Sequence, residues 1–184
     1  MKNLFINACV RGSDSRTLVI AKEILKNIPD TTTELVLDNE PLQPLTSGTL
    51  ALREKLIATG DFEHPIFDYA KQFASADTII VAAPHWDLSF PALLKIYLEN
   101  VCVSGITFKY NKGCPIGLCK AKRLIYITTS GGPIFADFGY NYIKTVSAAL
   151  LGIKDTVCYK AENLDINNIS ATEVLTKATI TKFE

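Results

Sequence analysis

The sequence predicts an α/β protein built on a doubly wound parallel sheet. Short apolar, β-branched segments alternate along the 184 residues with segments of helical spacing, a pattern typical of parallel sheets that carry helices on both faces. The most distinctive segment is 78–100, where an apolar run stops at Pro84 and an amphipathic helix follows Pro91. With 48% hydrophobic residues the chain can form one substantial core, so we expect a single domain over 1–184.

Each element follows from its local pattern. Five strands are expected at 3–9, 32–37, 77–83, 123–129 and 155–159, because these runs are short, apolar and β-branched. Helices are expected at 17–27, 49–76 (broken near Gly60 and Pro65), 91–103, 140–151 and 170–182, the last with Ser170 as cap and Glu173 three residues on. Residues 105–118 contain Asn-Lys-Gly, which indicates a small extended excursion or hairpin. Five strands suit a three-layer αβα arrangement with the flavodoxin-like order 2-1-3-4-5.

Charge and cysteine content exclude several classes of function. The 19 basic and 19 acidic side chains cancel, so no broad field attracts nucleic acid or an anionic membrane. No apolar run is long enough to span a bilayer, and the first residues do not resemble a signal peptide, so we expect a cytoplasmic protein. The five cysteines are scattered, and the C-x4-C spacing of Cys114 and Cys119 matches zinc sites poorly, so we expect free thiols and no metal.

Three polar loops follow predicted strands, at 9–15, 84–89 and 129–133. The carboxyl ends of parallel strands lie along one edge of a sheet, and open α/β proteins bind their ligands there. One ligand could therefore contact all three loops.

The first loop has the features of a phosphate site. It carries hydroxyls at Ser13, Ser15 and Thr17 and a guanidinium at Arg11, and it leads into a helix whose first N–H groups lack partners. The alternative is that Ser13 or Ser15 only caps the helix. The loop matches neither G-x-G-x-x-G nor G-x-x-x-x-G-K-[ST], which argues against a dinucleotide site or an ATPase loop.

The other two loops suit a flat ring. Trp86 offers an apolar wall, although it could also be an ordinary half-buried aromatic of a βα turn. His85 is more often solvated than catalytic in such a position, and Asp87 could cap the following helix. In the turn 130–132 the backbone can approach a ligand closely, because Gly131 and Gly132 have no Cβ. The alternative is that this turn is only flexible. Together the loops outline a flavin mononucleotide (FMN) site, and no catalytic triad or carboxylate pair is apparent.

These residues resemble the FMN-dependent NADH-azoreductases, within the wider NAD(P)H–quinone oxidoreductase group of flavodoxin-like fold. The resemblance covers nearly the whole chain and is strongest at 79–100, 105–110, 129–132 and 150–153. It implies a homodimer with FMN at the dimer interface. It also implies ping-pong, two-electron (hydride) transfer from NADH or NADPH to a quinone or an azo compound, with the cofactor supplying the chemistry and no catalytic side chain.

The resemblance also assigns FMN-binding positions. The phosphate end falls on Cys9, Arg11, Ser13, Asp14 and Ser15, the isoalloxazine on His85, Trp86, Asp87 and Leu88, and the pyrimidine end on Thr129, Ser130, Gly131 and Gly132. Three positions depart from the family pattern: Cys9 replaces a common Ser, Asp87 a usual Asn, and Pro133 stands where a polar residue often follows the glycines. An aromatic residue of a partner subunit, Phe108 or Tyr110, would wall the substrate space.

Two other functions fit the same fold. A flavodoxin-type electron carrier would bind FMN without turning over a substrate of its own, but such carriers are generally acidic and this chain has no net charge. A flavin-free binding or regulatory protein would use the same pocket for another ligand.

Overall fold

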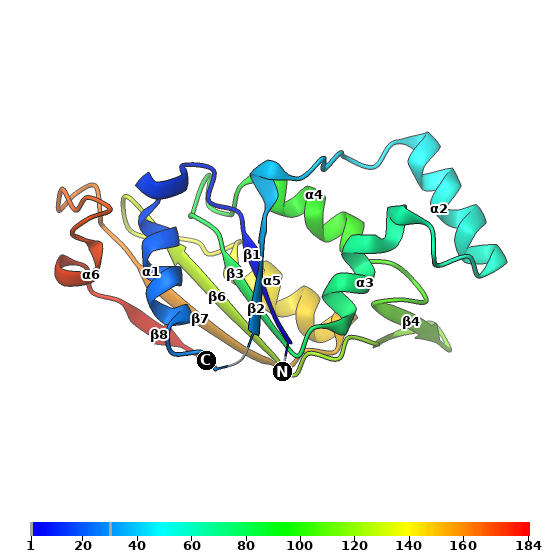
Figure 1. Ribbon diagram of the computed structural model, residues 1–184. Helices are drawn as coiled ribbons and strands as arrows, with labels where there is room; N and C mark the ends of the chain where they lie inside the picture. Colours follow the sequence, from blue (N-terminus) through cyan, green and yellow to red (C-terminus); the bar gives the residue numbers. More distant parts are fainter. Residues whose placement is uncertain (1, 30) are drawn as a thin grey trace.

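A computed structural model describes residues 2–29 and 31–184 (Figure 1). The strands are β1 (Lys2–Asn7), β2 (Thr31–Val36), β3 (Thr78–Ala82), β4 (Phe108–Asn111), β5 (Cys114–Gly117), β6 (Arg123–Thr129), β7 (Asp155–Ala161) and β8 (Thr181–Phe183). The helices are α1 (Arg16–Leu25), α2 (Ser47–Thr59), α3 (Asp68–Ser75), α4 (Ala92–Val101), α5 (Tyr140–Val146) and α6 (Val174–Lys177). Within the described residues the main sheet has six strands in the order β2-β1-β3-β6-β7-β8.

The first five strands of this sheet are parallel and have the predicted order 2-1-3-4-5. The prediction of an all-parallel, five-stranded sheet is nevertheless wrong, because β8 adds a sixth strand that pairs antiparallel with β7. The predicted helix over 170–182 is also wrong. Its only helical turn is α6, and Ala178 is already extended (φ −82°, ψ 141°).

The capping residues expected at the start of that helix do interact, but they stabilise a turn and not a long helix. The Glu173 carboxylate accepts the Ser170 backbone N–H at 3.3 Å and the Ser170 hydroxyl at 2.8 Å. Val174 is the one buried residue of α6, so the short helix lacks the apolar stripe that would extend it. The chain then extends and pairs through Thr181–Phe183 with the free edge of β7.

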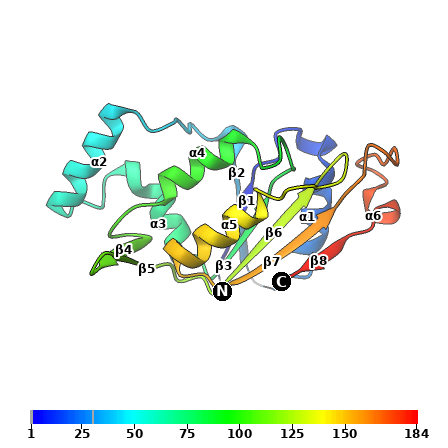
Figure 2. The same ribbon diagram turned by 180° about the vertical axis from the view of Figure 1, so that it is seen from behind.

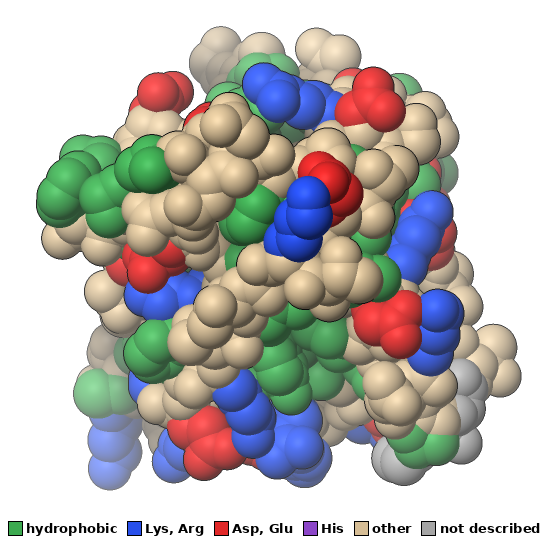
Figure 3. All heavy atoms as spheres, turned by 90° about the vertical axis from the view of Figure 1, so that its left-hand side faces the viewer, with side chains coloured by type: hydrophobic (Ala, Val, Ile, Leu, Met, Phe, Trp, Pro, Cys, Tyr) green, Lys and Arg blue, Asp and Glu red, His purple; other side chains and the backbone are tan. Residues whose placement is uncertain are grey.

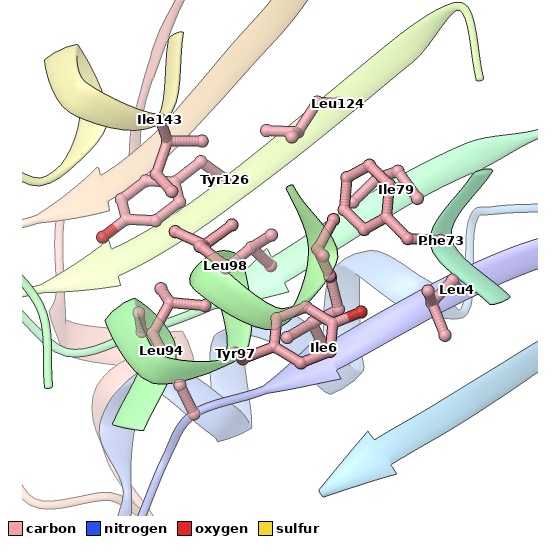
Figure 4. Close-up of a cluster of buried hydrophobic side chains, with 14 of the residues drawn as sticks. Leu4, Ile6, Phe73, Ile79, Leu94, Tyr97, Leu98, Leu124, Tyr126 and Ile143 are labelled. Atoms are coloured by element: carbon pink, nitrogen blue, oxygen red, sulfur yellow. The ribbon is translucent and has the colours of Figure 1, made fainter. Parts of the chain in front are cut away.

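The core lies in two layers, one on each face of the sheet. Because side chains alternate along a strand, Leu4 and Ile6 of β1 lie on one face and Phe5 lies on the other. Figures 1 and 2 show α1 on one face and α4 and α5 on the opposite face. On the α4 face, Tyr97 and its helix neighbours pack over the buried residues of β1, β3 and β6 (Figure 4).

The predicted break in 49–76 and the predicted hairpin are both confirmed. Gly60 ends α2 in the left-handed conformation (φ 71°), and a short 3-10 turn at Pro65–Phe67 precedes α3. Strands β4 and β5 form an antiparallel hairpin beside the main sheet. The predicted helix over 140–151 begins as α5, continues as a π turn over Ser147–Leu151 and stops at Gly152 (φ 79°).

Charged side chains of both signs are interspersed over the α6 end of the molecule (Figure 3). Among the described residues, no helix combines the length and the apolar character that crossing a bilayer would need.

Candidate functional site

The three predicted loops meet at one edge of the main sheet. Hydrogen bonds continue from strand to strand beyond the strand ends, and this fixes the loops to one another. These bonds are Ala8 N–H to Ala82 O (2.9 Å), Ala83 N–H to Ile127 O (3.0 Å), His85 N–H to Thr129 O (2.9 Å) and Ser130 N–H to Ala161 O (2.9 Å). The start of each loop is therefore held by the sheet, as expected for a preformed ligand site.

An open pocket lies where these loops converge. Its lining residues are Cys9, Val10, Arg11, Asp14, Ser15, Arg16, Thr17, Pro84, His85, Trp86, Thr129, Gly131 and Asp165. Of the thirteen predicted site residues, eight line this pocket. Ser13, Asp87, Leu88, Ser130 and Gly132 belong to the same loops but lie outside the lining.

The start of α1 forms one end of the pocket. Ser15 is the N-cap, and its hydroxyl accepts the Leu18 N–H at 3.2 Å, so the capping alternative is confirmed for this serine. Within the described chain, the backbone N–H groups of Arg16 and Thr17 donate to no acceptor. They are available to an anion at the positive end of the helix dipole, beside the exposed Arg11.

A buried hydroxyl pair connects this end of the pocket to the glycine turn. The Oγ1 atoms of Thr17 and Thr129 lie 2.6 Å apart, and both side chains are buried. The start of α1 is thereby attached to the carboxyl end of β6.

Cys9 lines the pocket without a free donor. Its Sγ lies 3.6 Å from Ala82 O, to which the thiol donates, and its backbone N–H donates to Asn7 Oδ1 at 3.0 Å. Burial raises the pKa of the Cys9 thiol to about 11, so this side chain is neutral near pH 7 and does not repel an anion.

The loop after β3 is a tight turn with strained backbone. Trp86 and Ser89 exchange two backbone hydrogen bonds (3.1 and 2.8 Å), and both central residues have positive φ, 50° at Asp87 and 65° at Leu88. Positive φ is tolerable for Asp but costly for Leu. The N-cap of α4 is Pro91, so the prediction that Asp87 could cap this helix is wrong.

This turn presents both side-chain and backbone groups to solvent. Trp86 is 38% exposed and lines the pocket, as does His85, whose Nε2 is buried without a partner in the described chain. The N–H groups of Asp87 and Leu88 likewise donate to no acceptor among the described residues. Backbone strain of this kind is characteristic of binding sites.

The glycine turn after β6 is ordered by hydrogen bonds to its carbonyl groups. The Ser130 hydroxyl donates to Gly132 O at 2.6 Å, and the Asp165 N–H donates to Gly131 O at 2.9 Å. The N–H groups of Gly131 and Gly132 have no acceptor within residues 2–29 and 31–184. The turn is therefore ordered by its carbonyls while its donors stay available.

Five lining residues were not among the predicted FMN-binding positions: Val10, Arg16, Thr17, Pro84 and Asp165. Arg16 Nη2 lies 2.7 Å from Asp165 Oδ1, and Arg16 Nη1 donates to Ile169 O at 3.1 Å. The position of Arg16 next to Ser15 at the helix start was a usable sequence signal. Asp165 offered none, because it comes from a fourth loop, after β7.

An open, mostly parallel α/β sheet with a polar pocket at the carboxyl ends of its parallel strands defines the class of doubly wound ligand-binding proteins. The family described as flavodoxin-like fold matches residues 1–181, and the chain belongs to this family.

Several named proteins are similar to this chain in sequence or in structure. An FMN-dependent NADH:quinone oxidoreductase of Clostridium perfringens is 38% identical over an alignment that covers 94% of this chain and 91% of the relative. The match to FMN-dependent NADH:quinone oxidoreductase 2 of Clostridium acetobutylicum is 42% identical over 110 residues, 56% of this chain and about half (54%) of that relative. The crystal structure of an FMN-dependent NADH-azoreductase from Bacillus anthracis in complex with FMN has a TM-score of 0.78 and 25% identity, covering 95% of this chain and 92% of that one.

Proposed function

We propose that this chain is an FMN-dependent NAD(P)H oxidoreductase that reduces quinones, azo compounds or both. One observation carries the proposal: a single pocket joins a helix start suited to a phosphate, an exposed tryptophan and a glycine turn with free donors. The full-length relatives, named as FMN-dependent NADH:quinone oxidoreductases, support it.

The donor set fits the two ends of FMN. The free N–H groups of Arg16 and Thr17 and the guanidinium of Arg11 would hold the phosphate, with Ser13 and Ser15 nearby. The free N–H groups of Gly131 and Gly132 would meet the carbonyl oxygens and ring nitrogens of the pyrimidine end. Cys9 would contribute contact area only, because both of its donors are already used.

The turn at 86–89 would orient the ring. Trp86 would lie along the isoalloxazine, and the free N–H groups of Asp87 and Leu88 would direct positive dipole ends toward it. Bound FMN would supply the two-electron chemistry between the nicotinamide donor and the acceptor. The residues of this chain would bind it, keep its position and stabilise the negative charge that reduction adds.

We also propose that the active form is a homodimer. The β4–β5 hairpin extends beside the main sheet and exposes Tyr110, Ile116 and Leu118, the first to 62%. Phe108 is buried, with its ring 5.5 Å from that of Tyr110 in an edge-to-face contact. Of the two aromatics implied by the family resemblance, Tyr110 is thus the one free to reach a partner subunit.

Anaerobic stopped-flow mixing of the FMN-loaded protein with NADH or NADPH tests the reaction. We expect the flavin absorbance to bleach, and to return when menadione or an azo dye is added. Flavin that binds but is not bleached by either nicotinamide would instead indicate an electron carrier. Protein that takes up no FMN would indicate the flavin-free alternative.

A further inference from the structure

The loop after β7 closes one side of the proposed FMN pocket. Its backbone is fixed to the glycine turn, because Leu164 N–H donates to Ser130 O at 3.1 Å and Asp165 N–H donates to Gly131 O at 2.9 Å. This loop is therefore attached to the glycine turn through its backbone, and Asp165 lines the pocket.

The Asp165 carboxylate lies directly against Gly131. A Cβ atom added to Gly131 would overlap the Asp165 side chain, so in this structure the carboxylate occupies the space that a larger residue at position 131 would fill. The ion pair with Arg16, at 2.7 Å, fixes its other oxygen, while 70% of the Asp165 side chain stays exposed. A negative charge thus lies at the end of the pocket where the glycine donors are free.

From this geometry, and resting on the proposed function, we infer that Asp165 lowers the reduction potential of the bound FMN. Reduction adds negative charge to the flavin ring, and in the proposed pose its pyrimidine end lies beside Gly131 and Gly132. A carboxylate at this point destabilises the reduced cofactor more than the oxidised one. The free glycine N–H groups act in the opposite direction, so Asp165 limits how strongly the turn favours reduction.

The expected effect is modest because the carboxylate is exposed and paired. Coulomb's law between surface charges a few ångströms apart gives on the order of a tenfold effect once Arg16 and water screen the interaction. We expect Asp165→Asn to raise the ratio of reduced-FMN to oxidised-FMN affinity by about tenfold, which for a two-electron couple is about 30 mV.

Midpoint potentials of the FMN-loaded proteins, measured by equilibrium titration against reference dyes, test this inference. Asp14→Asn is the matched control, since Asp14 lines the same pocket but lies in the turn before α1. We expect it to change FMN affinity equally in both redox states and to leave the potential unchanged. Asp165→Glu keeps the charge and should retain the wild-type potential.

An unchanged or lowered potential in Asp165→Asn overturns the inference, and so does an equal rise in Asp14→Asn. A rise in Asp165→Glu as large as that in Asp165→Asn also overturns it, because packing rather than charge would then be responsible. A wild-type protein that binds no FMN refutes the proposed function itself, which separates the two failures.

Discussion

The hydroxyl pair of Thr17 and Thr129 makes a strong prediction about stability. Replacing either residue with valine keeps the β-branched shape and removes one hydroxyl. The remaining hydroxyl then has no partner in a buried position, because the 2.6 Å contact is the single hydrogen bond of each side chain within the described residues. Removing both hydroxyls leaves no unsatisfied group.

The magnitude follows from burial. A lost hydrogen bond together with an orphaned buried hydroxyl costs about 2 kcal/mol of unfolding free energy, so Thr17→Val and Thr129→Val should each lower stability by roughly that amount. The double variant should lose less than either single variant, about 1 kcal/mol rather than about 4, since it leaves no unpaired buried hydroxyl. The cycle therefore predicts a coupling of about 3 kcal/mol.

Urea unfolding followed by far-ultraviolet circular dichroism measures this coupling. Thr145→Val is the control, because the Thr145 hydroxyl donates to Asn141 O on the exposed surface of α5, and we expect it to cost less than about 0.5 kcal/mol. Single-variant effects that simply add in the double variant would refute the idea that this pair ties α1 to β6.

Three further results are expected. Arg53→Met should lower the unfolding free energy by about 3 kcal/mol in urea titrations, because the buried guanidinium donates to two carbonyls at the end of α4 (3.0 and 2.9 Å). The pKa of Asp77 is lowered, chiefly by its hydrogen bond with Lys120, so its contribution is present above the ordinary carboxyl pKa and is lost as pH falls through the lowered value. Acid titrations of stability should therefore flatten in Asp77→Asn, and an unchanged profile would exclude this ion pair as a cause of acid sensitivity. Burial raises the pKa of Cys9 to about 11, so mass spectrometry after iodoacetamide treatment at neutral pH should find Cys114, which is exposed, alkylated first; equal labelling would contradict the buried thiol.

The fold was predictable wherever local pattern and tertiary environment agree. The β-branched run at 79–81 is apolar on both faces because β3 is covered by helices on both sides. Strands of this kind can be recognised from the sequence alone. The segment 178–183 cannot be recognised in this way, because its residues are mostly exposed and its strand, β8, pairs with the edge of β7. Pairing with an edge strand depends on where that edge lies, which the segment itself does not encode.

The site, like the fold, was predictable from the sequence only in part. Loops that follow buried strands could be placed at one edge of the sheet from the topology alone, so the glycine turn and Trp86 were found. Asp165 could not be found, because its place beside Gly131 depends on backbone hydrogen bonds between the loops after β6 and β7. The strain at Leu88 was also invisible, since leucine is an unusual choice for a positive φ.

The charges that line the pocket cancel just as those of the whole chain do. Arg11 and Arg16 line the pocket together with Asp14 and Asp165, and Arg16 is paired with Asp165 at 2.7 Å. Net charge therefore gives the pocket little attraction for a phosphate, so under the proposed function the oriented N–H groups at the start of α1, with Arg11 beside them, would supply the selectivity for an anion. Such dipoles act at hydrogen-bond distance, where salt screens weakly, whereas a cationic patch acts over a Debye length. Under the proposed function such a site would hold its anionic ligand by local geometry, and we expect the affinity to depend on the capped start of α1 more than on ionic strength.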